Sequence, residues 1–179
     1  ACLLGSEMCI RDRYDGLSAS LTVTTSDNDT VGLVLSKDNA TVSEDGTVSD
    51  NFSVVLRSEP TATVTLSASD NDSSEVSFSP STLVFGSDNW STPQWVSLTG
   101  KDDNTSDGLQ SILLTVSSDN SSTLDDQYDG LSASLTVTTS DNDSANFLVS
   151  PGVATVSENG TLSGSISVVL KSAPVADVT

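Results

Sequence analysis

Carboxylates gather in four segments between residues 30 and 143. This part of the chain holds 18 of the 25 Asp and Glu residues, and eleven of the 18 fall within segments 43–50, 70–75, 101–108 and 140–143. Calcium takes about six to eight oxygen ligands from carboxylates, amides and backbone carbonyls, whereas magnesium keeps more of its waters. The sequence has no His, and both Cys lie within its first nine residues, so softer metals lack their usual ligands. These residues therefore favour calcium binding. The eleven are Glu44, Asp45, Asp50, Asp70, Asp72, Glu75, Asp102, Asp103, Asp107, Asp141 and Asp143.

The stretches between these carboxylates alternate apolar and hydroxyl residues with period two, which predicts β-strands with one buried face. We expect seven strands at about 31–42, 51–57, 62–69, 76–85, 94–100, 110–117 and 131–139. The residues expected to face the core are Phe52, Val54, Leu56, Ala62, Val64, Leu66, Ala68, Val96, Leu98, Ile112, Leu114, Val116, Leu131, Ala133, Leu135 and Val137. Such strands predict an all-β, antiparallel, Ig-like (Greek-key) β-sandwich. Strands that alternate in direction place every second connection at the same end, so the four acidic segments should meet at one pole.

Two simpler interpretations of the acidic segments stay open. Asp and Asn are favoured in turns for their local hydrogen bonds, and an acidic surface aids solubility without binding any ion. A single motif such as the Asp-Asn-Asp at 141–143 does not separate these alternatives. The convergence of four segments is the stronger signal, and it favours calcium.

The charge and composition exclude several classes of function. A net charge of −19 repels nucleic acid and anionic membrane surfaces, and no apolar run approaches the length of a membrane span. Without His, a Ser nucleophile lacks its usual base, and the paired Asp residues lie in repeated loops rather than in one cleft. We therefore expect no nucleic-acid partner, no membrane insertion of this chain and no enzymatic activity.

An internal repeat of 114 residues organises the chain. Residues 14–29 and 128–143 are identical, and the match continues without a gap, with 34 identities over 52 aligned pairs. We expect the last strand of one unit at 14–29, a complete unit at 30–143 and the first part of a third unit at 144–179. Residues 1–13 hold both Cys and the only Met, and they resemble a translated sequencing-adapter tail. We expect them to be a non-native or disordered leader.

Four motifs of the complete unit carry a family resemblance: ATVSEDG at 40–46, NFSVVL at 51–56, GKDDNTSDG at 100–108 and LTVTTSDND at 135–143. In these motifs the unit resembles the Calx-beta domain, which occurs in sodium–calcium exchangers and in large bacterial surface proteins. The resemblance implies a seven-stranded sandwich whose loops at one end bind calcium. It also implies that the neighbouring repeats belong to the same kind of domain.

The resemblance also assigns ligands. Glu44 matches the family's early Glu ligand, the Asp pair at 102–103 its acidic pair, and the Asp-Asn-Asp at 141–143 its acidic exit motif. After the acidic pair, where the family often has Glu, this unit has Asn104, Asp107 and Gly108. The predicted Ca²⁺ ligands are Glu44, Asp70, Asp72, Asp102, Asp103, Asp107, Asp141 and Asp143.

We expect a calcium-binding structural or adhesive module of an extracellular or cell-surface protein, with Ca²⁺ stiffening an array of repeats. The expected partners are neighbouring repeats of the same chain. The alternative is a module without obligatory calcium that binds a surface glycan or a protein through its loops and Trp90 or Trp95. We expect instead that one of the two Trp residues closes the edge of the core.

Overall fold

The computed structural model describes residues 18–118 and 121–179, so the expected leader at 1–13 lies outside the described residues. The described residues form eleven strands, and none of them belongs to a helix that could cross a membrane. Nine strands make two facing sheets, with strand orders β1-β3-β7-β5 and β2-β9-β8-β4-β6. This confirms the predicted all-β, Ig-like sandwich. The nine strands are β1 (Leu33–Leu35), β2 (Asn39–Ser43), β3 (Ser49–Leu56), β4 (Val64–Asp70), β5 (Val76–Ser79), β6 (Thr82–Phe85), β7 (Gln94–Gly100), β8 (Gln110–Ser118) and β9 (Ser132–Ser140).

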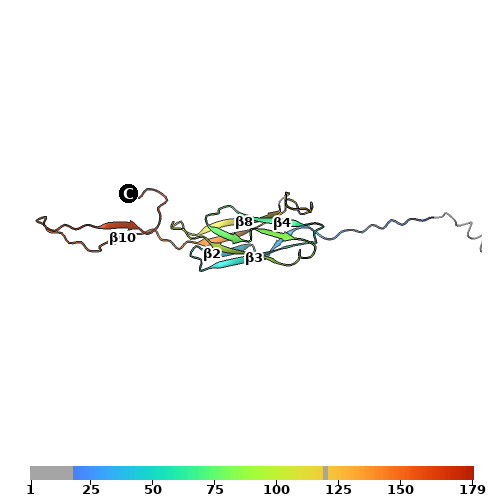
Figure 1. Ribbon diagram of the computed structural model, residues 1–179, viewed down its shortest axis with the longest axis horizontal. Coiled ribbons are helices and arrows are strands. Elements are labelled where there is room, and N and C mark those ends of the chain that lie inside the picture. Colours follow the sequence, from blue (N-terminus) through green and yellow to red (C-terminus); the bar gives the residue numbers. More distant parts are fainter. Residues whose placement is uncertain (1–17, 119–120) are drawn as a thin grey trace, which may run out of the picture.

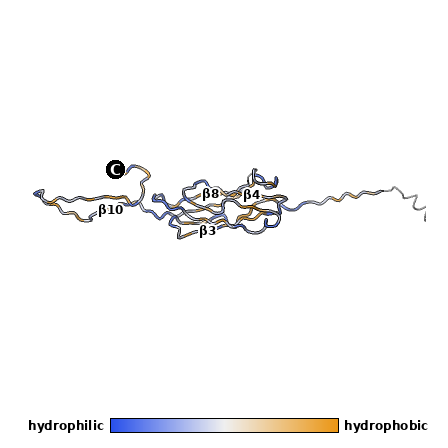
Figure 2. Tube along the Cα trace, in the orientation of Figure 1, coloured by the Kyte–Doolittle hydropathy of each residue, from blue (hydrophilic) through white to orange (hydrophobic). Residues whose placement is uncertain are grey.

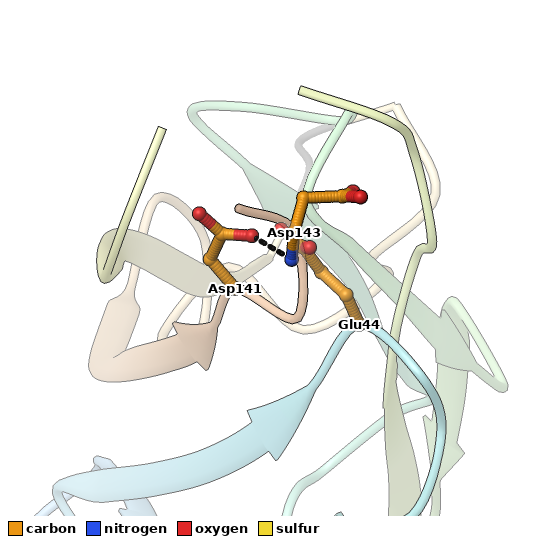
Figure 3. A group of neighbouring side chains, drawn as sticks. All are labelled: Glu44, Asp141 and Asp143. Carbon is orange, nitrogen blue, oxygen red and sulfur yellow. Dashed lines mark hydrogen bonds between the residues drawn. The ribbon is translucent and has the colours of Figure 1, made fainter. Parts of the chain in front are cut away.

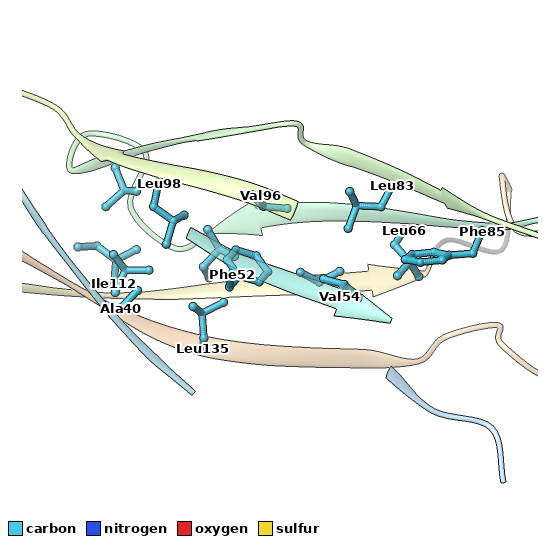
Figure 4. Packing of buried hydrophobic residues seen from close by; sticks show 14 of the residues in the cluster. Ala40, Phe52, Val54, Leu66, Leu83, Phe85, Val96, Leu98, Ile112 and Leu135 are labelled. Atoms are coloured by element: carbon cyan, nitrogen blue, oxygen red, sulfur yellow. The ribbon is translucent and has the colours of Figure 1, made fainter. Parts of the chain in front are cut away.

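The core lies between the two sheets and includes the apolar residues that the alternation selected (Figure 4). It also contains six residues that were not predicted: Ala40, Val42, Val76, Leu83, Phe85 and Tyr128. Every residue predicted to face the core is buried or half-buried, and Phe52, Leu66 and Leu98 are among the largest fully buried side chains. Burying one side chain of this size contributes about 1.5–3 kcal/mol. Many of the hydroxyl residues between them face outward, although Ser53 in β3 and Thr139 in β9 are buried.

Two of the seven predicted strands are each divided between the two sheets, which is why the sandwich has nine strands. The predicted strand 31–42 is β1 and β2, and the predicted strand 76–85 is β5 and β6. The inward-facing residues have odd numbers in β1 and even numbers in β2. In β5 they have even numbers, and in β6 they have odd numbers. Because side chains alternate along a strand, a change of parity marks a crossing from one sheet to the other. Pro80, which has no N–H to donate to a ladder, lies at the second crossing.

One strand pair departs from the predicted antiparallel arrangement. β2 pairs with β9 in parallel, from Asn39 opposite Thr136 to Ser43 opposite Ser140, while the other pairs are antiparallel. The prediction was wrong for this pair because the chain crosses to the second sheet before β2 begins. As a result β2 and β9 point toward the same end of the sandwich, and the residues that follow them emerge side by side.

The remaining strands, β10 (Phe147–Ser150) and β11 (Ser167–Leu170), form a separate antiparallel pair beyond one end of the sandwich, and residues 18–29 leave the opposite end without forming a strand (Figure 1). The two Trp residues of the sandwich also differ. Trp90 is half-buried against the core, as expected of one of them, whereas Trp95 in β7 is 57% exposed.

Candidate metal centre

Glu44 directly follows β2 and is turned into the end of the sandwich by a tight turn. Ser43 Oγ donates a hydrogen bond to Asp45 Oδ1 at 2.6 Å, and Thr47 N donates to the same oxygen at 2.9 Å. Because the Asp45 carboxylate is engaged in the turn, it stays at the surface, whereas the neighbouring Glu44 is only 3% exposed. The local sequence therefore selects which of the two adjacent acids enters the site.

Gly100, the last residue of β7, permits the close approach of this turn. A Cβ at position 100 would lie 2.2 Å from the Ser43 carbonyl oxygen and 2.9 Å from the Glu44 nitrogen, and both atoms are backbone. The Glu44 N–H in turn donates to the Ser140 carbonyl oxygen at 3.1 Å. Glu44 is thus held between the ends of β7 and β9.

The segment that follows β9 is tied to the loop between β7 and β8. Asp141 accepts hydrogen bonds from the Gly108 N–H at 2.8 Å and from the Asp143 N–H at 2.6 Å. Asn142 Nδ2 donates to Asp102 Oδ1 at 3.0 Å. These bonds fix the direction of the exit segment and bring its carboxylates beside the turn after β2.

Glu44, Asp141 and Asp143 form one cluster, in which one carboxylate oxygen of each residue lies within 4.8 Å of the others (Figure 3). Glu44 Oε2 and Asp143 Oδ2 are buried and have no hydrogen-bond partner among the described residues. A buried carboxylate oxygen without a partner is costly, since it has lost its water and gained nothing in exchange. Hard oxygen donors in this state fit a divalent cation such as calcium.

A second buried acid, Glu75, lies at the same pole and was not among the predicted ligands. It is 6% exposed, and its Oε2 is buried without a partner among the described residues. Glu75 directly precedes β5, whose first residue, Val76, is 1% exposed. Because side chains alternate along a strand, a residue directly before the inward-facing Val76 should face outward, so the sequence pattern does not identify Glu75 as buried.

Burial and mutual repulsion raise the pKa of three carboxyl groups at this pole. Burial is the main cause for Glu44, Glu75 and Asp143, and the negative charge of Asp103 adds to the rise in each of them. Asp141 behaves in the opposite way. Its pKa is lowered because backbone N–H groups donate to its carboxylate. The pole therefore combines one carboxylate whose pKa is lowered by hydrogen bonds with three whose pKa values stay raised.

Basic residues do not supply that compensation. Lys101 Nζ, in the loop between β7 and β8, donates to the Ser73 carbonyl oxygen. Within the part of the chain that the structure describes, Lys37 and Asp50 form the one ion pair, at 2.6 Å, and Asp50 lies in β3 rather than in the cluster. Clustered carboxylates without a cation repel one another, which is the electrostatic condition that a bound metal relieves.

The structure brings three of the eight predicted ligands together directly: Glu44, Asp141 and Asp143. Asp102 joins them through its hydrogen bond with Asn142. The ligand role of each residue stays a prediction, since proximity places it without testing it.

The other predicted ligands lie around Glu75 or farther away. The charges of Asp107 and Asp72 raise the Glu75 pKa, so these residues belong to the same pole. The Asp72 carboxylate also accepts two hydrogen bonds from Ser74. Asp70 ends β4 opposite Leu114 of β8 and is not one of the clustered residues.

No family model matches the sequence, and no curated protein matches it. Solved structures do resemble it in part. The YadV chaperone matches with a TM-score of 0.45 and 12% identity over 62% of this chain and 52% of its own. The apo-form Calx CBD1 domain matches with a TM-score of 0.43 and 13% identity over 64% of this chain and 97% of its own. The calcium binding domain CBD12 of CALX1.1 matches with a TM-score of 0.41 and 13% identity over 62% of this chain and 44% of its own. The chain thus spans about half the length of the first of these. At these TM-scores the similarities carry no argument about function.

Proposed function

We propose that residues 30–143 form a calcium-binding β-sandwich module of the Calx-beta type. The observation that supports this proposal is the pair of buried, unpartnered carboxylate oxygens on Glu44 and Asp143, at a pole where a third buried acid has a raised pKa. Glu44, Asp141 and Asp143 hold the ion, and Asp103 contributes further negative charge. The ion neutralises the repulsion that raises these pKa values.

Calorimetric titration of the full chain with Ca²⁺ and with Mg²⁺ tests this proposal. We expect saturable Ca²⁺ binding and weaker Mg²⁺ binding in the parent, and at least a tenfold loss of Ca²⁺ affinity in the double variant Glu44→Gln, Asp143→Asn. At a hundredfold excess over Kd, binding adds about 2.7 kcal/mol to the free energy of unfolding. The matched control is Asp126→Asn, an exposed acid in the connection between β8 and β9. Parent-like affinity in the double variant would disprove the ligand assignment.

We further propose that the module works in an extracellular or cell-surface array, in which calcium stiffens the junctions between units, and that it has no catalytic role. The support is the contact of the acidic loop between β7 and β8 with the segment that follows β11. Thr105 pairs with Ala173 as an isolated bridge, and the Ala173 N–H donates to the Asn104 carbonyl oxygen at 2.5 Å. Small-angle scattering of the full chain in calcium should give a longer, narrower particle than in chelator. Equal dimensions in both would contradict this part of the proposal.

The exposed indole of Trp95 favours a second candidate, binding of a glycan or a protein. A 57% exposed Trp on the outer side of a sheet offers an apolar face at low entropic cost. Loss of binding to a glycan array in Trp95→Ala, with Trp90→Phe as the control for the core, would favour this candidate.

A further inference from the structure

Thr139 places a hydroxyl group in the core at the end of β9. The strands of the sandwich carry hydrophobic residues at alternate positions (Figure 2), and in β9 Leu135 and Val137 precede Thr139 on the inward face. Thr139 is 0% exposed, and its Oγ1 has no hydrogen-bond partner among the described residues. A buried hydroxyl without a partner is costly, and Val would fill the same space without that cost. The departure from the apolar pattern therefore needs a physical reason.

The register of the parallel pair β2–β9 places Thr139 beside Glu44. Thr139 lies opposite Val42, and the Glu44 N–H donates to the Ser140 carbonyl oxygen at 3.1 Å, which continues the ladder beyond β2. Glu44 follows Val42 on the inward face, because residues two apart along a strand share a face. With strands about 4.8 Å apart and about 3.3 Å per residue, Glu44 and Thr139 are diagonal neighbours about 8 Å apart at their Cα atoms. The long Glu side chain can span most of this separation.

The atoms without a partner at this pole are complementary in their hydrogen bonding. Glu44, Glu75 and Asp143 each leave one carboxylate oxygen without a partner among the described residues, and an ionised carboxylate only accepts hydrogen bonds. Thr139 Oγ1 belongs to a hydroxyl, which donates one. Glu44 is the most buried member of the cluster and therefore the one nearest to the core side, where Thr139 lies. An unmatched donor and an unmatched acceptor thus occupy neighbouring positions on one inward face.

We propose that a buried water molecule links the Thr139 hydroxyl to Glu44 Oε2, and that Thr139 thereby positions this carboxylate from the core side. A water accepts a hydrogen bond from the hydroxyl and donates one to the carboxylate, so one molecule satisfies both groups. Globular proteins hold about one buried water per 27 residues, bonded to buried polar groups that otherwise lack a partner. Thr139 is a positioning residue, because it acts on the ion through Glu44.

The consequence for calcium rests on the proposed function. The Asn142 N–H donates to the Glu44 carboxylate, and the water holds the second oxygen of the same group. The direction of Glu44 is then fixed on both sides before the ion binds. Hydrogen-bond partners of metal ligands set the orientation of those ligands, and removing one typically lowers metal affinity about 10–100-fold.

Urea unfolding of Thr139→Val in chelator tests the water without any ion present. Val keeps the branched shape of Thr and removes only the hydroxyl. A hydroxyl without a partner would make this substitution stabilising and raise the urea concentration at the midpoint. We expect a lower midpoint instead, because the substitution removes the donor that holds the water against Glu44. In a Glu44→Ala background the same substitution should no longer lower the midpoint, since the acceptor is absent.

Calorimetric titration of the full-length variants with Ca²⁺ tests the positioning of Glu44. We expect Thr139→Val to lower Ca²⁺ affinity about tenfold, and Thr139→Ser, which keeps the hydroxyl, to stay within about twofold of the parent. The matched control is Thr123→Val at the other end of the sandwich. Thr123 is 8% exposed, and its Oγ1 donates to the Thr65 carbonyl oxygen at 2.9 Å. This control should lower the urea midpoint and leave Ca²⁺ affinity unchanged, which separates a loss of stability from a loss of positioning.

The outcomes distinguish this inference from the proposed function. A raised midpoint in Thr139→Val with parent-like Ca²⁺ affinity overturns the inference and leaves the proposed function standing. A lowered midpoint in chelator, with no Ca²⁺ binding by the parent, supports the water and overturns the calcium site. Equal losses of Ca²⁺ affinity in Thr139→Ser and Thr139→Val overturn the role of the hydroxyl, because the methyl group would then be what matters.

Discussion

Each end of the sandwich contains a buried acidic residue, but the pKa of this residue is lowered at one end and raised at the other. At the end away from the cluster, Asp125 is 3% exposed and accepts hydrogen bonds from the N–H groups of Thr61, Ala62 and Gln127. Burial alone would raise its pKa, but these donors outweigh burial and lower it. Glu44 is equally buried, yet its pKa is raised and one of its oxygens has no partner among the described residues.

The comparison separates an acid that the chain itself stabilises from acids that the proposed calcium site would stabilise. Asp125 is compensated by the chain itself, next to Tyr128, whose hydroxyl donates to the Ser58 carbonyl oxygen at 2.6 Å. The hydrogen bonds of the chain do not fully compensate the cluster around Glu44, because the Glu44 pKa stays raised and oxygens of Glu44 and Asp143 have no partner among the described residues. Its stability should therefore depend on what is added to the solution. The predictions below test this contrast, from the largest expected effect to the smallest.

Replacing Asp125 should cause the largest loss of stability, and calcium should not alter it. Asp125→Ala leaves the three part-buried backbone N–H groups of Thr61, Ala62 and Gln127 without their acceptor, which costs about 3 kcal/mol. Urea unfolding in calcium and in chelator should give the same loss. Asp126→Ala, an exposed neighbour, is the control. A loss confined to one of the two conditions would contradict the division between the ends.

Gly100→Ala should damage the cluster through the backbone. The added Cβ would overlap the Ser43 carbonyl oxygen, so the turn that carries Glu44 must move, at a cost of about 2 kcal/mol. Calcium affinity should fall together with stability, as measured by calorimetry and by urea unfolding. Gly152→Ala, where a Cβ meets no atom within 4 Å, should change neither. Unaltered calcium affinity in Gly100→Ala would mean that this turn does not position a ligand.

Glu44→Gln should stabilise the protein in chelator, by about 1 kcal/mol, because it removes an uncompensated buried charge. In calcium the same substitution should be destabilising relative to the parent, since the ion loses a ligand. This reversal of sign distinguishes Glu44 from Asp125. Glu59→Gln, an exposed acid away from the cluster, is the control and should show no reversal. Equal effects in both solutions would indicate that Glu44 is merely structural.

The pH dependence of stability should show the smallest effect and should also differ between the two ends. Groups with raised folded pKa values, Glu44, Glu75 and Asp143, bind more protons in the folded state than in the unfolded state. In chelator, stability should therefore fall as pH rises from about 4.5 through their folded pKa values. The contribution of Asp125, whose pKa is lowered, is present above about 3.8 and is lost as pH falls below it. Saturating calcium should abolish the fall at higher pH. Thermal melting between about pH 2 and pH 7 measures both, and a fall at higher pH that persists in calcium would count against the cluster as its cause.

Much of the fold could be predicted because alternation reports burial directly. Phe52, Val54 and Leu56, like the alternate apolar residues of the other strands, face the core as their spacing indicates. The division of 31–42 and 76–85 into strands of different sheets was missed, although the change of parity within each carries the information. The parallel pairing of β2 with β9 follows from that division and could not be predicted without it.

The gathering of acidic loops at one end of the sandwich could be predicted from the order of the strand connections. The cluster of Glu44, Asp141 and Asp143 within it could not. Loop composition gives eleven acids at one end without saying which side chains turn inward. That choice depends on close contacts such as Gly100 against Ser43 and on the use of Asp45 in its own turn. Glu75 was missed because its place directly before the inward-facing Val76 predicts an outward-facing side chain.

Carbon-13 NMR of the side-chain carboxyl groups at pH 7, followed as Ca²⁺ is added to the full chain, tests the central claim most directly. The account predicts saturable shifts of the Glu44, Asp141 and Asp143 resonances at a common affinity, with Asp125 unaffected. Small shifts of similar size on all carboxyl groups, without saturation, would contradict it and would leave the acidic pole as a charged surface with no ion site.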